Sequence, residues 1–249
     1  MKADDALAVV ERASDTPRRL FAPLAAGYDA RAQALCLFQY RRWHRFLLSR
    51  LDLTQSAVDS GSVRVLDMAS GTGALALDLA RLSRVRVVGA DVTRTMLLEA
   101  QKRLRPATGH IDLVECDAQT LPFARQTFDA IVFAYLLRYV ADVPSTLAGL
   151  ANALRPGGVM ASLDFGMPSG LAYPLWRLYT GLVLPAAAAL LSPGWRRVGA
   201  FLGPSIRDFY RLWPEERLLR AWQEHGFENV QAQRLSLGGG LVMWGRKAR

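Results

Sequence analysis

Residues 65–74, Val-Leu-Asp-Met-Ala-Ser-Gly-Thr-Gly-Ala, decide the fold because the secondary structure that they predict changes twice within a short segment. The apolar run that ends near Asp67 predicts a β-strand, the small residues after it predict a tight turn, and Ala74 begins a helical pattern. Gly71 and Gly73 allow the backbone to approach a ligand closely, and the free N–H groups at a helix start favour an anionic group. The segment therefore predicts a strand, a ligand-binding turn and a helix.

Short β-branched runs alternate with helical segments from Val63 onward. This alternation predicts parallel strands joined by crossover helices, which is an α/β layered sheet. The expected strands are Val63–Leu66, Val85–Gly89, Ile111–Glu115, Phe128–Phe133 and Gly158–Leu163. The expected helices are Ala74–Leu82, Thr95–Leu104 and one that begins at Pro144 and closes at residues 154–158.

Two segments flank this core, and no linker-like run of Ser, Gly or Pro divides the chain. We therefore expect one domain over residues 1–249, with a helical extension at 1–60, the sheet core at 61–166 and an apolar insertion at 167–213. Residues 214–249 predict a helix (Pro214–His225) and two strands, Phe227–Leu235 and Gly240–Gly245. Such a terminal hairpin commonly adds an antiparallel edge to a mostly parallel sheet.

Composition excludes a disordered chain and a coiled coil, because 51% of the 249 residues are hydrophobic and 21% are charged. The formal net charge of +9 favours nucleic acid or an anionic membrane as a partner. Nearly all of the basic residues are arginine, however, and a GC-rich coding sequence gives the same bias without any such partner. The charge alone therefore leaves the partner open.

Cysteine usage and hydropathy bear on the cellular compartment. Cys36 and Cys116 have no CxxC or His-rich companion, so we expect no metal site and no disulfide, which fits a reduced cytoplasm. Acidic residues near the N-terminus argue against a signal peptide. The longest weakly polar stretch, Leu178–Leu191, has 14 residues and contains Pro185, so we expect it to be too short for a bilayer.

Acidic residues stand at the ends of three predicted strands, where ligands of α/β sheets bind. A carboxylate at Asp91 can accept hydrogen bonds from both ribose hydroxyls, a feature that sites for NAD and for S-adenosylmethionine share. Asp67 before the glycine turn and Asp117 after the third strand separate the two, since Asp117 is placed to contact an adenine edge. The three acids together resemble the class I S-adenosylmethionine-dependent methyltransferases.

That resemblance implies a Rossmann-like sheet of seven strands, mostly parallel, with a helical insertion as a lid, and S-adenosyl-L-methionine as the cofactor. It implies that the turn from Asp67 to Gly73 holds the methionine end, Asp91 the ribose and Asp117 the adenine amino group. Met96 would lie against the adenine. The remaining residues that the resemblance assigns to the cofactor are Ala69, Gly71, Thr72, Val92, Ala118 and Phe133.

The chain is most similar to the ubiquinone and menaquinone C-methyltransferase family. The matching segments are Tyr28-Asp29 before a basic helix with Trp43, Asp117-Ala118-x-x-Leu121-Pro122-Phe123, Leu137-Arg138, Leu163-Asp164-Phe165 and Leu202-x-x-Ser205-Ile206. Tyr139 stands where the family commonly has asparagine. The resemblance implies methylation of a ring carbon of a hydrophobic quinol or related aromatic.

Such a carbon becomes nucleophilic when a neighbouring phenol ionises, so the site must stabilise an oxygen anion and remove a proton. Arg138 follows the fourth predicted strand, and its guanidinium is suited to that oxygen, with an ordered water taking the proton. Tyr28 and Tyr139 are candidate hydrogen-bond donors to the same oxygen. His44 is a candidate base that we rank below these residues and expect on the surface of its helix.

Two segments suggest where an apolar substrate enters. Residues 171–206 are too apolar for an exposed loop, so they either complete the core or cover a pocket for an isoprenoid or polycyclic substrate, which we favour. Between Arg18 and Arg50 there are seven arginines and one acid, interleaved with aromatic residues. This pattern favours peripheral attachment to an anionic bilayer.

Four alternatives stay open: methylation of O, N or C in a specialised metabolite, a non-catalytic cofactor-binding partner, nucleic-acid modification, and an NAD enzyme. Nucleic acid ranks lower because no RNA-binding module is present and because it gives the apolar insertion no role. The oligomeric state is left open. We expect a cytoplasmic protein, in part peripheral to the inner face of the membrane.

Overall fold

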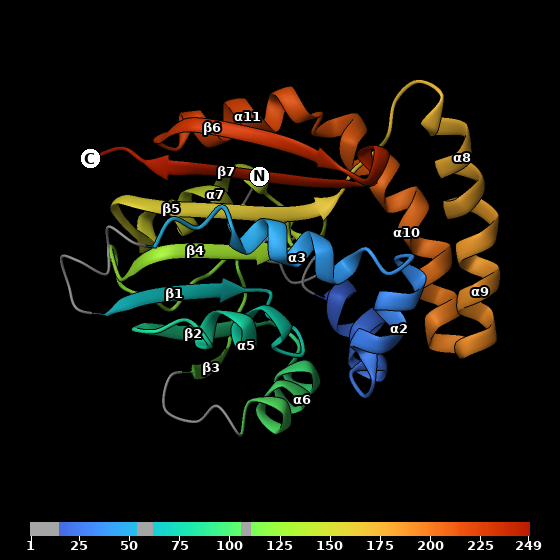
Figure 1. The fold of residues 1–249 in the computed structure, drawn as a ribbon, viewed down its shortest axis with the longest axis horizontal. Coiled ribbons are helices and arrows are strands. Elements are labelled where there is room, and N and C mark those ends of the chain that lie inside the picture. Colours follow the sequence, from blue (N-terminus) through green and yellow to red (C-terminus); the bar gives the residue numbers. More distant parts are fainter. Residues whose placement is uncertain (1–14, 54–61, 106–110) are drawn as a thin grey trace, which may run out of the picture.

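The computed structural model describes residues 15–53, 62–105 and 111–249. Its strands form a seven-stranded sheet in the order β3-β2-β1-β4-β5-β7-β6 (Figure 1). Strands β1 to β5 pair in parallel, whereas β7 pairs antiparallel with both β5 and β6. The strands are β1 (Val63–Met68), β2 (Val85–Asp91), β3 (Ile111–Glu115), β4 (Phe128–Ala134), β5 (Leu154–Phe165), β6 (Phe227–Leu235) and β7 (Gly240–Lys247). The expected fold class, including the antiparallel hairpin at the C-terminal side, is confirmed.

Helices cover both faces of the sheet, which explains why its central strands are apolar on both sides. On one face, Leu66 and Met68 of β1 belong to the same core as Leu147 and Trp222. On the other face, Val65 shares a core with Trp43. The first face is covered by α7 (Val143–Ala153), α11 (Glu215–Glu224) and part of α10 (Pro193–Leu212), and the second by α3 (Tyr40–Leu48), α5 (Ala74–Ala80) and α6 (Arg94–Leu104).

The described part of the N-terminal extension is helical, as expected. It comprises residues 15–21, the short η1 (Ala22–Leu24), α2 (Tyr28–Leu35) and α3. The strands β1, β4 and β5 point toward α2 and toward the helices of the insertion (Figure 1). The expectation that no signal peptide is present concerns residues 1–14 and lies outside the described residues.

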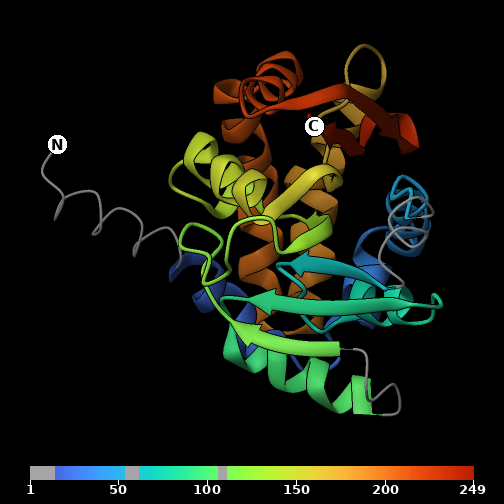
Figure 2. The ribbon, with the colours of Figure 1, turned by 90° about the vertical axis from the view of Figure 1, so that its left-hand side faces the viewer.

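The insertion consists of α8 (Ala172–Leu178), the π-helical turn η4 (Tyr179–Val183), α9 (Leu184–Leu191) and α10. In Figure 2 its orange helices stand behind the sheet and run across the strands. The expectation that the apolar stretch is too short for a bilayer is wrong, because residues 172–191 form one continuous helix of 20 residues. Pro185 sits in the first turn of α9, directly after the wider π turn, where a missing N–H is tolerated. By length and composition alone this helix suffices to cross a membrane, although little of it is buried.

Candidate active site

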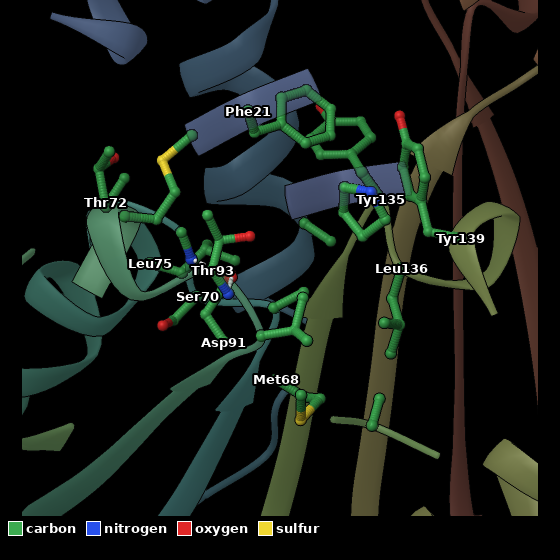
Figure 3. A pocket seen from close by; sticks show the side chains of 18 of the residues that line it. Phe21, Met68, Ser70, Thr72, Leu75, Asp91, Thr93, Tyr135, Leu136 and Tyr139 are labelled. Atoms are coloured by element: carbon green, nitrogen blue, oxygen red, sulfur yellow. Dashed lines mark hydrogen bonds between the residues drawn. The ribbon is translucent and has the colours of Figure 1, made fainter. Parts of the chain in front are cut away.

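A first cavity, here called the polar cavity, opens at the carboxyl ends of the central strands. It is bounded by the turn after β1, the end of β2, the start of α6 and the segment after β4 (Figure 3). Strand ends of a parallel sheet meet at this edge, so side chains from distant parts of the sequence converge here. The sequence-predicted residues that line it are Tyr28, Ala69, Gly71, Thr72, Asp91, Val92, Met96, Asp117, Ala118 and Tyr139.

The turn after β1 is held by Asp91 of the next strand. The backbone N–H groups of Gly71 and Thr93 each donate to one oxygen of Asp91, both at 2.8 Å. Each oxygen keeps a second lone pair for a ligand. Gly71 has a φ of +55°, and a Cβ built on it would meet nothing within 4 Å, so the backbone is open to the cavity at that point. Burial raises the pKa of Asp91 above its usual value.

Ala69 adopts a left-handed conformation, with a φ of +61°. This conformation costs a residue with a Cβ about 1 to 2 kcal/mol relative to glycine. The sharp turn therefore begins directly after β1, and Ser70, whose N–H donates to the Ala90 carbonyl at 3.0 Å, returns the chain toward β2. The side chain of Ser70 lines the cavity, where its buried hydroxyl has no partner among the described residues.

Three residues that the sequence assigned to the cofactor do not line the polar cavity. Asp67 lies within β1, which continues to Met68, and is fully buried, so burial raises its pKa to about 8. Gly73 faces α6, because a Cβ there would lie 3.1 Å from Ala100. Phe133 lies within β4 and packs against Trp222 in the core, with ring centroids 6.3 Å apart. The assignment of these three residues to the cofactor stays a prediction.

A second and larger cavity, here called the apolar cavity, lies between α2, α3, the insertion and the turn between β6 and β7. Its wall is almost entirely aliphatic and aromatic, and Arg138 is the charged side chain in it among the described residues. The expectation that the insertion covers a pocket rather than only completing the core is consistent with this geometry. Insertion residues in the wall include Leu175, Trp176, Tyr179, Leu184, Trp195 and Ile206.

The two cavities share one wall of aromatic rings. Phe21, Tyr28, Tyr40, Tyr135 and Tyr139 line both of them. The rings contact one another, with centroids 5.6 Å apart between Phe21 and Tyr139 and 6.2 Å apart between Tyr40 and Tyr135. Figure 3 shows Tyr135 and Tyr139 beside Phe21 and away from Ser70 and Asp91. Burial raises the pKa of all four tyrosine phenols, so at neutral pH they are hydrogen-bond donors.

Arg138 lies in the 3-10 turn η3 (Leu137–Tyr139) directly after β4, and its side chain is 1% exposed. Its Nε donates to Asp164 Oδ1 at 2.7 Å and its Nη1 lies 3.5 Å from Ser205 Oγ. Nη2 is buried and has no partner among the described residues. Burial alone would lower the pKa of Arg138, but Asp164 holds it above its ordinary value. The arginine is therefore a buried cation at the apolar cavity rather than part of a surface ion pair.

The structure corrects the placement of His44, which we expected on the surface of its helix. His44 is 4% exposed and lines the polar cavity, and its Nε2 has no partner among the described residues. Burial lowers its pKa to about 4. The signal was present in the sequence, because Tyr40, Trp43, His44 and Leu47 have the i, i+3, i+4, i+7 spacing of a buried helix face. The many arginines between them obscured that spacing.

Two further residues were missed as parts of the site. Tyr135 follows β4 directly, with a left-handed φ of +58°, and its buried hydroxyl has no partner among the described residues. Phe21 precedes η1 and reaches the wall from the N-terminal extension. The position of Tyr135 at a strand end was the available signal, whereas no sequence pattern marks Phe21. Among the described residues, no group of three or more His, Cys, Asp or Glu side chains is placed to hold a metal ion.

The chain is similar to proteins of one family along almost its whole length. The model of the ubiE/COQ5 methyltransferase family matches residues 10–247. A ubiquinone/menaquinone biosynthesis C-methyltransferase UbiE from Desulfotalea psychrophila is 35% identical over 231 residues, which cover 92% of this chain and 89% of the relative. A demethylmenaquinone methyltransferase from Tropheryma whipplei is 31% identical over 224 residues, covering 89% and 87%.

Solved structures resemble the fold at lower identity. A candidate S-adenosyl-L-methionine-dependent methyltransferase from Methanococcus maripaludis superposes with a TM-score of 0.63 at 18% identity, covering 92% of this chain and 94% of that one. The CurJ carbon methyltransferase gives 0.55 at 20% identity, covering 76% and 49%. At such identities the likeness concerns the fold alone, and it agrees with the sheet order described above.

Proposed function

Because the chain belongs to the ubiE/COQ5 methyltransferase family, we propose that it methylates a ring carbon of a hydrophobic quinol. The family and the relatives make the chain an S-adenosyl-L-methionine-dependent methyltransferase. That the acceptor is a quinol goes beyond family membership and is our proposal. It is supported by two relatives whose names specify ubiquinone, menaquinone or demethylmenaquinone.

The observation that carries the proposal is the aromatic wall between the two cavities. A polar, acid-lined space and a larger apolar space meet only across the rings of residues that line both. Methyl transfer by in-line displacement needs a donor and an acceptor held on opposite sides of the migrating group, with water excluded. Two adjoining cavities, one with Asp91 and Asp117 in its wall and one with no acidic residue among the described residues that line it, provide this arrangement for a donor with cationic groups and an apolar acceptor.

The residues of the polar cavity fit the cofactor. The backbone at Gly71 is open to the cavity, Asp91 keeps free lone pairs, and the hydroxyl of Ser70 is buried and unpaired among the described residues. Asp91 is suited to the ribose hydroxyls, Asp117 to the adenine edge, and Met96 to the adenine face. Asp67 lies buried within β1 and does not line the cavity. When bound, the cofactor supplies an electrophilic methyl group on a sulfonium.

Arg138 is suited to the oxygen anion of the acceptor. Its guanidinium is permanently charged, its buried Nη2 is unpaired among the described residues, and the residue lines the apolar cavity. An anionic phenol oxygen beside it gains a charge-assisted hydrogen bond, which favours the ionised quinol that attacks through carbon. Arginine does not accept the proton, so an ordered water carries it away. Tyr28 and Tyr139 stay protonated and are suited to donate to the same oxygen.

Asp164 and Ser205 position the guanidinium without touching the acceptor. Asp164 binds Nε and Ser205 approaches Nη1, which leaves Nη2 free. A fixed guanidinium costs little reorganisation when the charge develops on the acceptor. The sequence segments around these two residues were among those that most resembled the family, and their shared contact with Arg138 gives a physical reason for that.

We further propose that the enzyme works in the cytoplasm and attaches peripherally to the inner face of the membrane. Leu37, Leu175 and Leu237 line the apolar cavity, yet they are 62%, 67% and 85% exposed, so they form its outer rim. Exposed arginines on α3 lie next to this rim in the chain. An apolar rim with nearby cations suits contact with an anionic bilayer, from which a lipid-soluble quinol is collected.

The acceptor is tested by incubating the purified protein with labelled S-adenosyl-L-methionine and demethylated quinols of different tail lengths. We expect label on a ring carbon, and more of it for tailed quinols than for the bare ring. Transfer to polar acceptors alone overturns the quinol proposal. An Asp117→Asn variant serves as a control, since it weakens the donor site and leaves the apolar cavity intact.

Membrane attachment is tested by sedimentation with vesicles of phosphatidylglycerol or of phosphatidylcholine. We expect binding to the anionic vesicles, weakened by about tenfold in Leu37→Asp and Leu237→Asp, because each change places a charge on the apolar rim. Leu98→Asp is the matched control, because Leu98 is an exposed leucine of α6 that does not line the apolar cavity. Equal losses in all three variants, or no binding at all, contradict the attachment.

A further inference from the structure

The polar cavity contains acidic side chains and no lysine or arginine among its described lining residues. Asp91 and Asp117 line it, and Asp29 lies behind Thr72, whose hydroxyl donates to Asp29 at 2.7 Å. The proposed cofactor carries a sulfonium, an ammonium and a carboxylate. The acids suit the two cationic groups, whereas the carboxylate has no cationic partner among these residues. The backbone N–H groups of the turn after β1 can donate to the carboxylate, but they carry no net charge, and an ionised carboxylate that leaves water is stabilised further by a cation.

His44 is the one described lining residue that can become a cation below neutral pH. It comes from α3, its Nε2 is buried and unpaired, and its ring packs on Tyr40 with centroids 4.0 Å apart. The neighbouring charge is Asp29 of α2, which also pairs with Arg103 of α6, and the neighbouring titratable groups in the wall are the phenols of Tyr40 and Tyr135. None of these groups hydrogen-bonds Nε2, so the nitrogen is available to a ligand in the cavity.

We propose that His44 binds the carboxylate of the cofactor's methionine moiety through Nε2 and takes up one proton from solvent as it does so. The inference rests on the proposed function, because it assumes that the polar cavity is the cofactor site. Without ligand the imidazole is neutral, since burial lowers its pKa to about 4. A carboxylate in contact with the ring opposes that shift and favours the imidazolium. The proton therefore arrives with the ligand, and no bond is broken.

The competing explanation is that His44 only packs against Tyr40. In that case the histidine stays neutral whether or not the cavity is filled. Its replacement would then weaken every ligand of the cavity to the same extent, because a packing defect does not distinguish a carboxylate from a hydrogen atom. The two explanations therefore differ in a comparison of two ligands and in a proton count.

The experiment is isothermal titration calorimetry of the full chain with S-adenosyl-L-methionine and with its decarboxylated form, which lacks only the carboxylate. Titrations at pH 6 in two buffers of different ionisation enthalpy give the number of protons taken up. A neighbouring carboxylate raises the pKa of a histidine by roughly 1 to 3, so for the wild type we expect up to about one proton more with the cofactor than with the decarboxylated form. For His44→Gln we expect this difference in proton uptake to vanish and the affinity for the cofactor to fall at least about tenfold. The affinity for the decarboxylated form should stay within about twofold.

The control is His225→Gln, because His225 caps α11 and does not line the cavity. We expect it to bind both ligands and to take up the proton as the wild type does. Equal losses for both ligands in His44→Gln, or equal proton counts for the two ligands in the wild type, overturn the role of His44 while leaving the cofactor site intact. If neither ligand binds the wild type, the proposed function fails as well. The difference in proton count between the two ligands needs no variant, and a proton that Asp67 releases to either cationic ligand cancels in it, so it decides the question even if His44→Gln does not fold.

Discussion

The polar and apolar cavities are built in different ways. The polar cavity comes from strand ends and the turns that follow them, such as 69–72, 91–93 and 134–140. The apolar cavity is closed by segments as distant in the chain as Leu37 and Leu237. A sheet of this topology places its strand ends at one edge whatever is added around it, whereas the second cavity exists only because added helices pack there. The proposed donor site thus follows from the fold, and the proposed acceptor site follows from the additions.

The largest effect on activity is expected for Arg138, because this residue lines the apolar cavity and not the polar one. Replacing Arg138 alone leaves Asp164 charged and buried, which costs about 3 to 5 kcal/mol of stability, so the double variant Arg138→Gln/Asp164→Asn is the cleaner test. We expect kcat to fall by about a thousandfold. We expect the affinity for S-adenosyl-L-methionine to change by less than about twofold. Rapid-quench kinetics and calorimetry measure the two quantities, and an equal loss in both breaks the division between the cavities.

The converse prediction concerns Asp91, which lines only the polar cavity. Asp91→Asn loses a charged acceptor for the ribose hydroxyls and also weakens the two backbone hydrogen bonds that hold the turn. We expect the affinity for S-adenosyl-L-methionine to fall by about thirtyfold, in line with hydrogen bonds to charged groups. The KM for the quinol should stay nearly constant, measured at a saturating concentration of the cofactor. A rise in both constants contradicts independent cavities.

Asp67 tests where the polar cavity ends, because it is fully buried in β1 and does not line the cavity. Its folded-state pKa of about 8 exceeds the ordinary value of 3.8, so the folded state holds the proton more tightly. The resulting stabilisation is complete below about pH 4 and is lost as the pH rises toward 8. Between pH 5 and 7 we expect the free energy of unfolding to fall by about 1.4 kcal/mol per pH unit more in the wild type than in Asp67→Asn.

Urea denaturation of the ligand-free protein at several pH values measures this difference. The affinity of Asp67→Asn for S-adenosyl-L-methionine, measured in parallel, should stay within about threefold of the wild type. A loss of affinity as large as that expected for Asp91→Asn would show that Asp67 contacts the ligand and that the polar cavity extends to it. Parallel pH slopes in the two proteins would show that Asp67 is already ionised in the folded state.

The smallest prediction concerns Ala69, whose φ of +61° suits glycine better than alanine. Ala69→Gly removes the cost of the left-handed conformation but adds freedom to the unfolded chain, and the two effects partly cancel. We expect a gain in stability of less than about 1 kcal/mol, seen in thermal unfolding, with cofactor affinity unchanged. A clear loss of stability would mean that the methyl group of Ala69 packs usefully in the cavity wall.

The polar cavity could largely be predicted from the sequence, because its signals are local. The glycine turn and the acids at Asp91 and Asp117 follow from where strands end. Asp67 lies within the strand and not beyond it because β1 continues to Met68, and one residue decides which of the two holds. Gly73 and Phe133 face packing partners and do not line the cavity, and their assignment to the cofactor stays a prediction.

The sequence predicted that an apolar cavity is present but not how its wall is assembled. The composition of residues 171–206 predicted that they cover a pocket. The continuity of the helix through Pro185 depends on a π turn, which no sequence pattern predicts. Likewise, the burial of His44 depends on the packing of α3 against the sheet. The contact of Phe21 with Tyr139 joins the N-terminal extension to the segment after β4, and such tertiary proximity is not encoded in the spacing of either segment.

The aromatic wall has a consequence for steady-state behaviour. Its five aromatic residues line both cavities, so a molecule in one cavity is bordered by the same side chains as a molecule in the other. Any change that the proposed donor makes in the dissociation constant of the acceptor is matched by the same factor in the opposite direction. An inhibitor that binds in the apolar cavity would through such coupling also change the affinity of the polar cavity for the proposed methyl donor. Its potency would then depend on the concentration of that donor.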